Sequence, residues 1–402
     1  MRILHLVGDM RLPRQPDIDS ASGVIVATLA LAAAQVRRGH EVWVVGLGRE
    51  HWHSMWCGVR LIQLTPTARM CLRVGGHQID LCNHVPYVAL THRHAFDVIH
   101  GSPYYYLRFL RARMRLAYFH TDPFHRGSGA ISTAFSPADF ALVGRTTDAQ
   151  LAVSAFVAGQ LRRGLDDSTN IQVVYNGVDT ARFAAGPRAA ARARLRAEWG
   201  IADSTSLFLF AGAFVPEKGV LPLARTFARL VQERSDIALA LAGGSALWVQ
   251  NLAQEDAAAG YERMIRETLS PAVAAGRARM LGQVGAAHMP DIYAAADVVV
   301  VPSIWNDPFP LVALEALAAG RPVLASAVGG LPESVDPSCG LLTPPGDEAA
   351  LAEAMITLSA DPQRHRLLGD GAIVRASRFS WAGAARAIDQ IYATYFAQRG
   401  TA

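Results

Sequence analysis

The lysine content of this chain singles out one residue. The sequence has 38 lysine and arginine residues, and Lys218, in FAGAFVPEKGV, is its only lysine. A lysine ammonium is a compact charge that can approach a phosphate where a planar guanidinium needs more room. The sequence therefore indicates a phosphate-binding role for Lys218. The alternative is that one lysine has survived by chance in an arginine-rich chain.

Two acids in a second segment have an unusual placement. The stretch PSIWNDPFPLVALEALAAGRPVLAS, from Pro302 to Ser326, contains Asp307 and Glu315 with seven residues between them. Asp307 stands in a proline-rich loop, and Glu315 stands early in a run with helical periodicity. As alternatives, Asp307 is a turn residue or a helix cap, and Glu315 a solvated helix residue. If both acids act at one site, the strands and helices around them must bring them together.

Those elements are predicted to be alternating strands and helices. In the first part of the chain RILHLVG, HEVWVVGL, FDVIHG and RLAYFH predict strands, and GVIVATLALAAAQVRRG predicts a helix closed by Gly39. A second series follows, with strands at SLFLFAG, IALALAGG, ARMLGQV, DVVVVPS and RPVLAS. Such alternation is typical of a parallel sheet covered by helices on both faces. The topology of residues 51–94 is not predicted.

The chain is long enough for two hydrophobic cores. Its 402 residues exceed the usual size of one domain. We predict an N-terminal Rossmann-like domain over residues 1–183, a second over 184–375, and a last helical segment over 376–402 that can cross back to the first domain. Ligands of such sheets bind beyond the carboxyl ends of the strands. The loop carrying Lys218 and the loop carrying Asp307 both follow predicted strands.

Composition narrows the class of protein. No apolar run reaches the roughly 18 residues of a membrane span, and the N-terminal segment lacks a signal-peptide pattern. The four cysteines, which show no metal-type spacing, are expected to be thiols in a reducing cytoplasm. Residues 1–183 have 19 Arg against 13 acids, and residues 184–402 have 19 basic residues against 21 acids. The basic first half suits an anionic partner, or else its arginines are merely solvated.

At this point the sequence resembles the retaining, nucleotide-sugar-dependent glycosyltransferases of family 4. The matching stretches are SGVIVATLALAAAQVRRGHEVWVV, FDVIH, VVYNGVDTARF, FAGAFVPEKGV, MLGQVGAAHMPDIYAAADVVVVPS, DPFPLVALEALAAGRPVLASAVGGLPE and GLLTPPGDEAALAEAM. Their order and spacing cover almost the whole chain. The resemblance implies the GT-B fold, in which two Rossmann-like domains face each other across a cleft.

The resemblance also implies roles for individual residues. Lys218 is similar to the lysine that contacts the donor diphosphate, Glu315 to the carboxylate that binds both ribose hydroxyls, and Asp307 to an acid that holds the donor sugar. His120, in AYFHTDPFH, is similar to a histidine beside the reacting sugar and acceptor, although a core histidine is the alternative. Further donor contacts are implied for Gly23, Val284, Phe309, Leu311 and Val312. Catalysis is assigned to His120, Lys218 and Asp307.

Four positions depart from the family pattern. Asp307 replaces the usual glutamate, and Ala213 stands where a second cation, an arginine, is usual. Arg11, Arg14 and Arg126 are candidate replacements for that cation. The phosphate loop SASGVIV has lost one of two glycines, so a helix N-cap by Ser20 or Ser22 is an additional or alternative role. Pro310 replaces a frequent glycine and removes one backbone donor.

The resemblance implies a donor and leaves the acceptor open. We expect a nucleotide diphosphate sugar, with UDP or GDP favoured over ADP, and no metal ion. Paired histidines in the first half show no four-ligand pattern. The acceptor is a hydroxyl on a glycan, a lipid or a small metabolite. The three consecutive tyrosines and four arginines in GSPYYYLRFLRARMRLAYFH could meet a sugar or lipid phosphates, or form a buried stripe with a basic face. A cytoplasmic enzyme is expected, with contact to the inner membrane face as an option.

Three other functions compete with this interpretation. A dehydrogenase should show G-x-G-x-x-G after a strand, and GLGREHW lacks the third glycine. A GT-B phosphorylase or epimerase, and a catalytically silent nucleotide-sugar-binding protein, remain open. The scattered arginines do not favour nucleic acid, because no recognition motif accompanies them. Asn176 and Asp179 are predicted to act as hinge and cap residues.

Overall fold

The computed structural model divides into two compact units. It describes residues 1–8, 10–16, 21–65, 71–74, 77–101, 107, 109–125, 134–166, 169–184, 186–245 and 252–400. Unit 1 comprises Met1–Phe124, Ala134–Gly177 and Trp381–Ala402, and unit 2 comprises His125–Thr133 and Val178–Ser380. The chain passes from one unit to the other at Gly177, a few residues before the boundary proposed from the sequence.

Unit 1 is built on a mostly parallel sheet, as the alternation of strands and helices predicts. Its described strands form one eight-stranded sheet in the order β10-β9-β8-β7-β1-β2-β4-β3, in which β3 is antiparallel to β4. A separate antiparallel pair is formed by β5 and β6. The elements are β1 (Arg2–Leu6), α1 (Gly23–Arg37), β2 (Glu41–Leu47), β3 (Trp52–Trp56), β4 (Val59–Leu64), β5 (Cys71–Val74), β6 (His77–Asp80), α2 (Leu81–Arg93), β7 (Phe96–Gly101), β8 (Ala112–Phe119), α3 (Pro137–Thr146), β9 (Ala149–Ala152), α4 (Ala155–Arg162), β10 (Ile171–Val173) and α14 (Trp381–Gly400).

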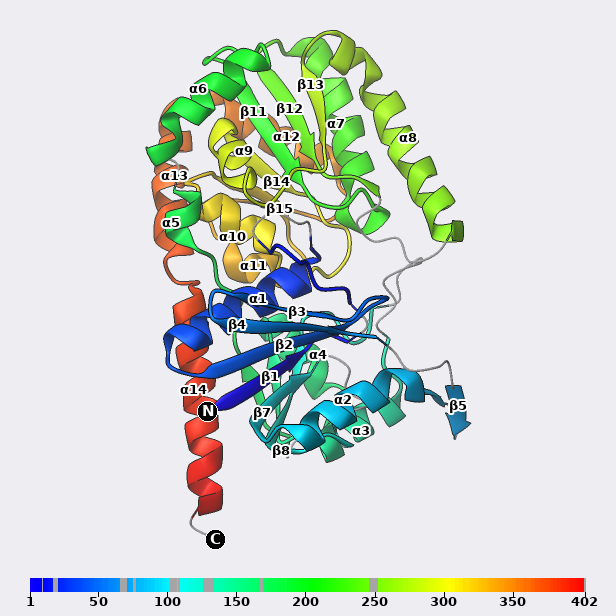
Figure 1. The fold of residues 1–402 in the computed structure, drawn as a ribbon. Helices are drawn as coiled ribbons and strands as arrows, with labels where there is room; N and C mark the ends of the chain where they lie inside the picture. The colour runs from blue at the N-terminus through cyan, green and yellow to red at the C-terminus, as the bar shows by residue number, and fades with distance from the viewer. Residues whose placement is uncertain are drawn as a thin grey trace. The chain divides into compact units, whose positions relative to one another are not determined.

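The last helix packs on unit 1 (Figure 1). Helix α14 contacts α1 through a buried polar group at Tyr392, whose hydroxyl accepts from Gln35 Nε2 at 3.1 Å. The same hydroxyl hydrogen-bonds His100 Nε2. At the surface, Asp389 pairs with Arg38 and with His40. Tyr392 is fully buried, so this aromatic side chain of α14 belongs to the core of unit 1.

Unit 2 is a second Rossmann-like sheet. Its described strands are all parallel and run in the order β13-β12-β11-β14-β15-β16. The elements are α5 (Thr180–Phe183), η2 (Gly186–Arg188), α6 (Ala189–Glu198), β11 (Ser206–Ala211), η3 (Pro216–Lys218), α7 (Val220–Glu233), β12 (Ile237–Ala242), α8 (Leu252–Ala274), β13 (Ala278–Gly282), α9 (Met289–Ala295), β14 (Val298–Val301), α10 (Leu311–Ala318), β15 (Val323–Ser326), α11 (Leu331–Ser334), β16 (Gly340–Thr343), α12 (Glu348–Ala360) and α13 (Pro362–Ala376).

Helices cover both faces of the unit 2 sheet (Figure 1). One core joins the strands to α7, α8 and α12 through apolar side chains such as Phe208, Leu239 and Phe227. On the other face α10 packs against α5, α9 and α13. Strands buried on both faces read as continuous apolar runs, which is why IALALA and VVVV are uninterrupted.

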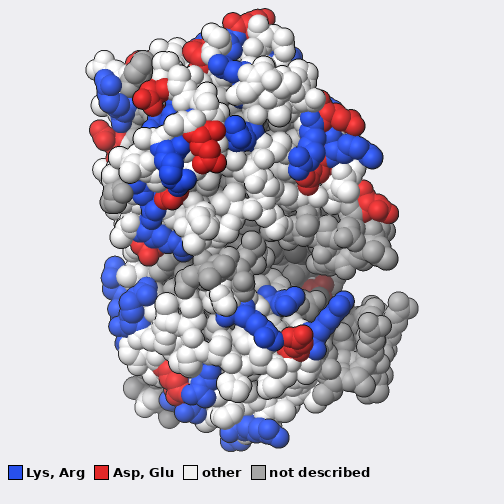
Figure 2. All heavy atoms as spheres, turned by 45° about the horizontal axis from the view of Figure 1, so that its top comes forward, with Lys and Arg blue, Asp and Glu red and all other residues white. Residues whose placement is uncertain are grey.

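The charged side chains of the surface and the hydropathy of the helices bear on possible partners. On the face drawn in Figure 2, the basic side chains are scattered among acidic and uncharged ones, without a single cationic stripe among the described residues. Several arginines of unit 1 are paired with acids, as Arg2 is with Glu41 and Arg113 with Asp97. In the part of the chain that the structure describes, no helix has the length and hydropathy needed to cross a bilayer.

Candidate functional site

Lys218 and Asp307 meet where the strand order of unit 2 reverses. The chain proceeds from β11 through β12 to β13, and then continues on the opposite side of β11 with β14. In open parallel sheets a ligand binds beyond the strand ends at such a reversal. Lys218 lies in the loop after β11, and Asp307 lies in the loop after β14. Lys218 Nζ donates to Asp307 Oδ2 at 2.5 Å, so the two loops are joined by an ion pair.

The turn that carries Lys218 depends on a glycine. Gly219 follows Lys218 with φ +69°, a left-handed conformation that glycine adopts without steric cost. A Cβ at this position would lie 1.8 Å from the carbonyl oxygen of Pro302, so the turn packs directly on the neighbouring loop. The amide of Ile304 also donates to the carbonyl of Glu217 at 2.9 Å. Backbone contacts therefore fix the lysine turn against the loop of Asp307.

The loop of Asp307 is held from its other side by the GGLPE segment. The amide of Gly330 donates to the carbonyl of Asp307 at 2.8 Å. A Cβ on Gly329 would lie 2.1 Å from that carbonyl oxygen. The carboxylate is almost fully buried and also accepts from Ser303 Oγ at 3.1 Å. Asp307 does not cap α10, because the N-cap residue is Pro310.

Glu315 lies one turn into α10 and has a fixed partner. Tyr293 Oη, from the fully buried Tyr293 of α9, donates to Glu315 Oε2 at 2.7 Å. Burial raises the pKa of Glu315 to about 7, while the Tyr293 hydrogen bond and the nearby Arg182 oppose that rise. One carboxylate oxygen is thus engaged by the tyrosine, and the group changes charge close to neutral pH.

The loop that carries Val284 is held by α5. Arg182 Nη2 donates to the carbonyl of Ala286 at 2.7 Å, and the ring of Phe183 packs edge-on against Tyr293. Asp179 begins α5 as its N-cap and accepts from the amide of Arg182 at 3.0 Å, which confirms its predicted capping role. Val284 itself is partly exposed on this loop. Residues just after Gly177 therefore position the segment between β13 and α9.

The start of α10 offers backbone donors. The amides of Leu311 and Val312 are the first two of the helix and have no backbone partner among the described residues. Such amides and the helix dipole favour an anion. Phe309 differs from these neighbours, because its side chain is buried against Phe379 with the ring centroids 5.4 Å apart. Its ring belongs to the packing of unit 2.

The remaining candidates lie in unit 1. Gly23 is the exposed first residue of α1, and Ser22 caps that helix by accepting from the amide of Ile25 at 3.4 Å. Ser20 lies outside the described residues. His120 follows β8, and its ring centroid is 4.3 Å from that of Tyr118. Burial, aided by His5, lowers the pKa of His120 to about 4, so its imidazole is neutral at pH 7.

No contact among the described residues links Ala213 to an arginine that could replace the missing cation. Ala213 is buried. Arg14 pairs with Glu50 at 2.7 Å in unit 1, Arg11 is exposed in the same unit, and Arg126 lies outside the described residues, as do Tyr104–Tyr106. Among the described side chains, no group of three or more His, Cys, Asp and Glu residues is placed to hold a metal.

Two family models match the chain in sequence. The model Glycosyltransferase Family 4 matches residues 21–182, and the model Glycosyl transferases group 1 matches residues 205–361. Together they cover most of both units, including the loops of Lys218, Val284 and Asp307. The chain belongs to glycosyltransferase family 4.

Relatives and solved structures agree with this family. The D-inositol 3-phosphate glycosyltransferase of Saccharomonospora viridis is 38% identical over 255 residues, which is 61% of this chain and 55% of that protein. The chain spans about half the length of the curated relatives it matches. Sucrose-phosphate synthase from Thermosynechococcus elongatus has a TM-score of 0.78 at 23% identity, covering 99% of both chains. Anabaena HepE in complex with UDP-glucose has a TM-score of 0.75 at 20% identity, covering 98% of this chain and 100% of that one. The chain therefore has the GT-B fold.

Several residues of this family 4 site were not predicted from the sequence. Tyr293 and Ser303 each bond one of the two key acids, and Arg182 holds the loop of Val284. Ser303 stands four residues before Asp307 in the segment already singled out, so its position was a usable signal. Tyr293 and Arg182 had no comparable signal, because their partners lie 22 and 104 residues away along the chain.

Proposed function

We propose that this chain is a retaining glycosyltransferase that moves a sugar from a nucleotide diphosphate sugar to a hydroxyl acceptor. The observation that carries the proposal is the contact of Lys218 with Asp307 at the strand-order reversal of unit 2. A cation and a buried acid form an ion pair there. The loop of this acid leads directly into α10, the helix that carries Glu315. This combination suits the diphosphate, the sugar and the ribose of one donor.

Each residue has a defined task in this proposal. Glu315 accepts from the ribose hydroxyls with the oxygen that Tyr293 leaves open. Lys218 has three N–H donors, so it can keep Asp307 while it turns another toward the diphosphate. Asp307 holds the donor sugar. The amides of Leu311 and Val312 add two donors to the phosphate oxygens, and Val284 lies against the base.

The reaction step follows from these tasks. The acceptor oxygen forms a bond to the anomeric carbon on the face from which the diphosphate leaves, and the bond from that carbon to the phosphate oxygen breaks. A donor phosphate oxygen takes the acceptor proton. Negative charge grows on the leaving diphosphate, so Lys218 stabilises the transition state more than the bound donor. No described carboxylate is needed as a covalent nucleophile.

The comparisons suggest where to begin with substrates. UDP or GDP donors are proposed, and the solved HepE structures name UDP and UDP-glucose as their ligands. The curated relatives carry the name of an inositol phosphate glycosyltransferase, which makes a phosphorylated polyol a reasonable first acceptor to test. No metal ion is proposed.

A donor panel tests the function. UDP-, GDP- and ADP-sugars are compared by thermal shift, and the products formed with the preferred donor are analysed by mass spectrometry. We expect slow release of free nucleotide without acceptor, and loss of that release in Lys218→Ala. Retention of the anomeric configuration, read by NMR of the product, tests the stereochemistry. Inversion would contradict the retaining mechanism.

A silent nucleotide-sugar-binding protein is the second candidate. It is favoured by Ala213, which removes one of the two usual cations, and by the engagement of Lys218 with Asp307. Such a protein would bind the preferred donor and release no nucleotide with any acceptor. The same panel therefore separates the two functions.

A further inference from the structure

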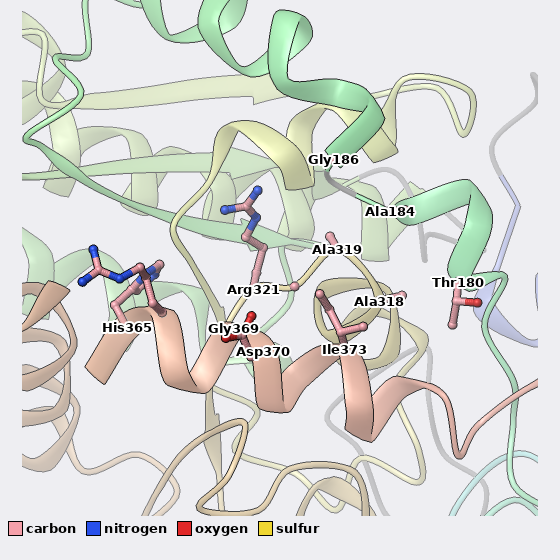
Figure 3. A pocket seen from close by; sticks show the side chains of 12 residues that line it. Thr180, Ala184, Gly186, Ala318, Ala319, Arg321, His365, Gly369, Asp370 and Ile373 are labelled. Atoms are coloured by element: carbon pink, nitrogen blue, oxygen red, sulfur yellow. The ribbon is translucent and has the colours of Figure 1, made fainter. Parts of the chain in front are cut away.

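Unit 2 contains a cavity away from the residues assigned to the donor. Its volume is about 520 Å³, within the usual range for small-molecule sites. It lies between the end of α10, the segment from α5 to η2, and α13 (Figure 3). Its lining includes Thr180, Ala319, Arg321, His365, Asp370 and Ile373. None of the residues assigned to the nucleotide sugar lines it.

Arg321 is the unusual residue of this cavity. Its Nε is sealed from solvent and has no hydrogen-bond partner. Among the described residues its guanidinium forms no side-chain hydrogen bond and no ion pair. Burial and the charges of Arg192 and Arg196 lower the pKa of Arg321 to about 10, although the charge of Asp297 opposes this shift. The side chain nevertheless stays protonated at pH 7, so a partly buried cation lies here whose Nε has no hydrogen-bond partner.

The neighbouring acid, Asp297, acts on Arg321 through its charge, but the described hydrogen bonds that it accepts come from other groups. Asp297 Oδ1 accepts from Arg192 at 2.6 Å, and Asp297 Oδ2 accepts from Arg196 at 2.9 Å and from the amide of Leu207 at 2.7 Å. The carbonyl oxygen of Asp297 accepts a hydrogen bond from His365 Nε2 at 2.8 Å. The carbonyls of Ala294–Ala296 at the end of α9 also accept from Arg192. Three arginines thus surround a single acid, and Arg321 is the one left over.

The rest of the lining suits an anion attached to a small carbon body. Arg366 adds a second cation, and Asp370 is the one acid among the lining residues. Ala318, Ala319 and Ile373 supply apolar surface. A buried unpaired charge is costly unless a ligand of opposite charge completes it. A guanidinium binds phosphate oxygens in a two-pronged geometry.

We propose that this cavity binds the phosphate group of a phosphorylated molecule, with Arg321 as the main ligand. The site is separate from the nucleotide-sugar site, and the proposal does not depend on the catalytic function. Carboxylates are a weaker match, because they leave more of the cationic lining without a partner. The phosphate can belong to a soluble metabolite or to a lipid headgroup.

Inorganic phosphate is the probe that tests the site. Phosphate is titrated at constant ionic strength against the whole chain, and the unfolding temperature is recorded. Because phosphate can also reach Lys218, the titration is repeated in Lys218→Met. We expect a saturable stabilisation that persists in Lys218→Met. In Arg321→Gln, the phosphate concentration needed for half of the maximal stabilisation should rise at least tenfold. Arg364→Gln, on the same helix α13 and outside the cavity lining, is the matched control and should leave the response intact.

Two results of the phosphate titration would overturn the proposal. One is a phosphate response that Arg321→Gln leaves unchanged; the other is no response in the native chain or in Lys218→Met. A second variant guards against a folding defect: Arg321→Met should raise the unfolding temperature in phosphate-free buffer, because it removes a partly buried charge whose Nε has no hydrogen-bond partner. A lower unfolding temperature for Arg321→Met would mean that Arg321 is already satisfied within the protein, against the proposal.

A vesicle arm identifies the source of the phosphate. Phosphatidylcholine vesicles with and without phosphatidic acid are sedimented with the native chain and with Arg321→Gln. Binding that requires both phosphatidic acid and Arg321 supports a lipid headgroup. A free-phosphate response without vesicle binding supports a soluble ligand.

Discussion

At the scale of single residues, Glu315 shows how packing sets the chemistry of a carboxylate. Its oxygen is fixed by a tyrosine hydroxyl at 2.7 Å, and burial raises its pKa to about 7. The ionised form accepts hydrogen bonds from both hydroxyls of a ribose more strongly, because protonation turns one oxygen into an O–H donor and removes the negative charge. The protonation of one side chain is therefore expected to govern donor binding near neutral pH.

The affinity for the nucleotide sugar should thus rise with pH. The diphosphate of a nucleotide sugar does not titrate in this range, which makes the intact sugar the right ligand. Between pH 8 and pH 6 we expect roughly a tenfold loss of affinity, because each pH unit below the pKa protonates Glu315 tenfold further. Isothermal titration calorimetry at each pH measures this affinity. Glu315→Gln should bind weakly at every pH, and a native profile as flat as that of Glu315→Gln would contradict the assignment.

The Lys218–Asp307 pair allows structure and catalysis to be separated. Lys218→Met leaves a carboxylate that is 4% exposed without its cation, which should cost about 3 kcal/mol of unfolding free energy. The double variant Lys218→Met/Asp307→Leu removes both charges and should recover most of that stability. It should still release no nucleotide from the donor. Recovery of activity along with stability would show that neither charge is catalytic.

At the scale of elements, the short turn between β11 and α7 determines where Lys218 points. The strand was predicted correctly from SLFLFAG, because its apolar run is continuous. The contact between the lysine turn and Pro302 was not predictable, since it joins loops more than 80 residues apart. The same holds for Gly329 and Gly330, which were recognised as a family mark and are now explained by their contact with the Asp307 loop.

Two alanine variants test the close approach at Gly219. Gly219 and Gly346 have nearly the same left-handed φ, +69° and +73°. A methyl at Gly219 meets the Pro302 carbonyl at 1.8 Å, whereas at Gly346 the nearest atom is in Ile304 at 3.8 Å. Gly346→Ala should cost about 1–2 kcal/mol, the price of the conformation alone. Gly219→Ala should cost more and also reduce nucleotide release, as read by urea unfolding and a donor-hydrolysis assay. Equal effects of the two variants would show that the contact does not position Lys218.

At the scale of the whole molecule, the two units contain buried titratable groups of opposite kinds. In unit 1, burial lowers the pKa of His5 to about 4 and holds that of His100 well below its usual value. In unit 2, burial raises the pKa of Glu315. The overall architecture followed from strand and helix alternation, whereas this clustering did not, because His5 and His100 are 95 positions apart and meet only through the pairing of β1 with β7.

Acid should therefore weaken unit 1 and spare unit 2. Between about pH 6.5 and 4, His5 and His100 bind protons in the unfolded chain but stay neutral in the folded protein, where they are buried. The stability of unit 1 therefore falls as the pH is lowered. The contribution of His5 alone is about 3 kcal/mol, fully present above pH 6.5. Glu315 acts in the opposite direction, because the folded state holds its proton and stability falls as the pH rises from about 4.5 to 7.

Hydrogen exchange with mass spectrometry resolves the two units in one experiment. After correction for intrinsic rates, peptides of β1 and β7 should lose protection at pH 5 relative to pH 7.5, and peptides of α10 should not. His5→Gln should reduce the acid sensitivity of unit 1, whereas His53→Gln, at an exposed position of β3, should not. Equal loss of protection in both units would argue against this distribution of buried groups.

The central claim is that Lys218, Asp307 and Glu315 hold one nucleotide sugar, and donor affinity in single variants tests it most directly. Calorimetry with the preferred donor at pH 8 compares Lys218→Met, Asp307→Asn and Glu315→Gln with the control Arg364→Gln. We predict at least a tenfold weaker affinity for Lys218→Met and for Glu315→Gln, a smaller loss for Asp307→Asn, and native affinity for the control. Native affinity in both Lys218→Met and Glu315→Gln would contradict the account.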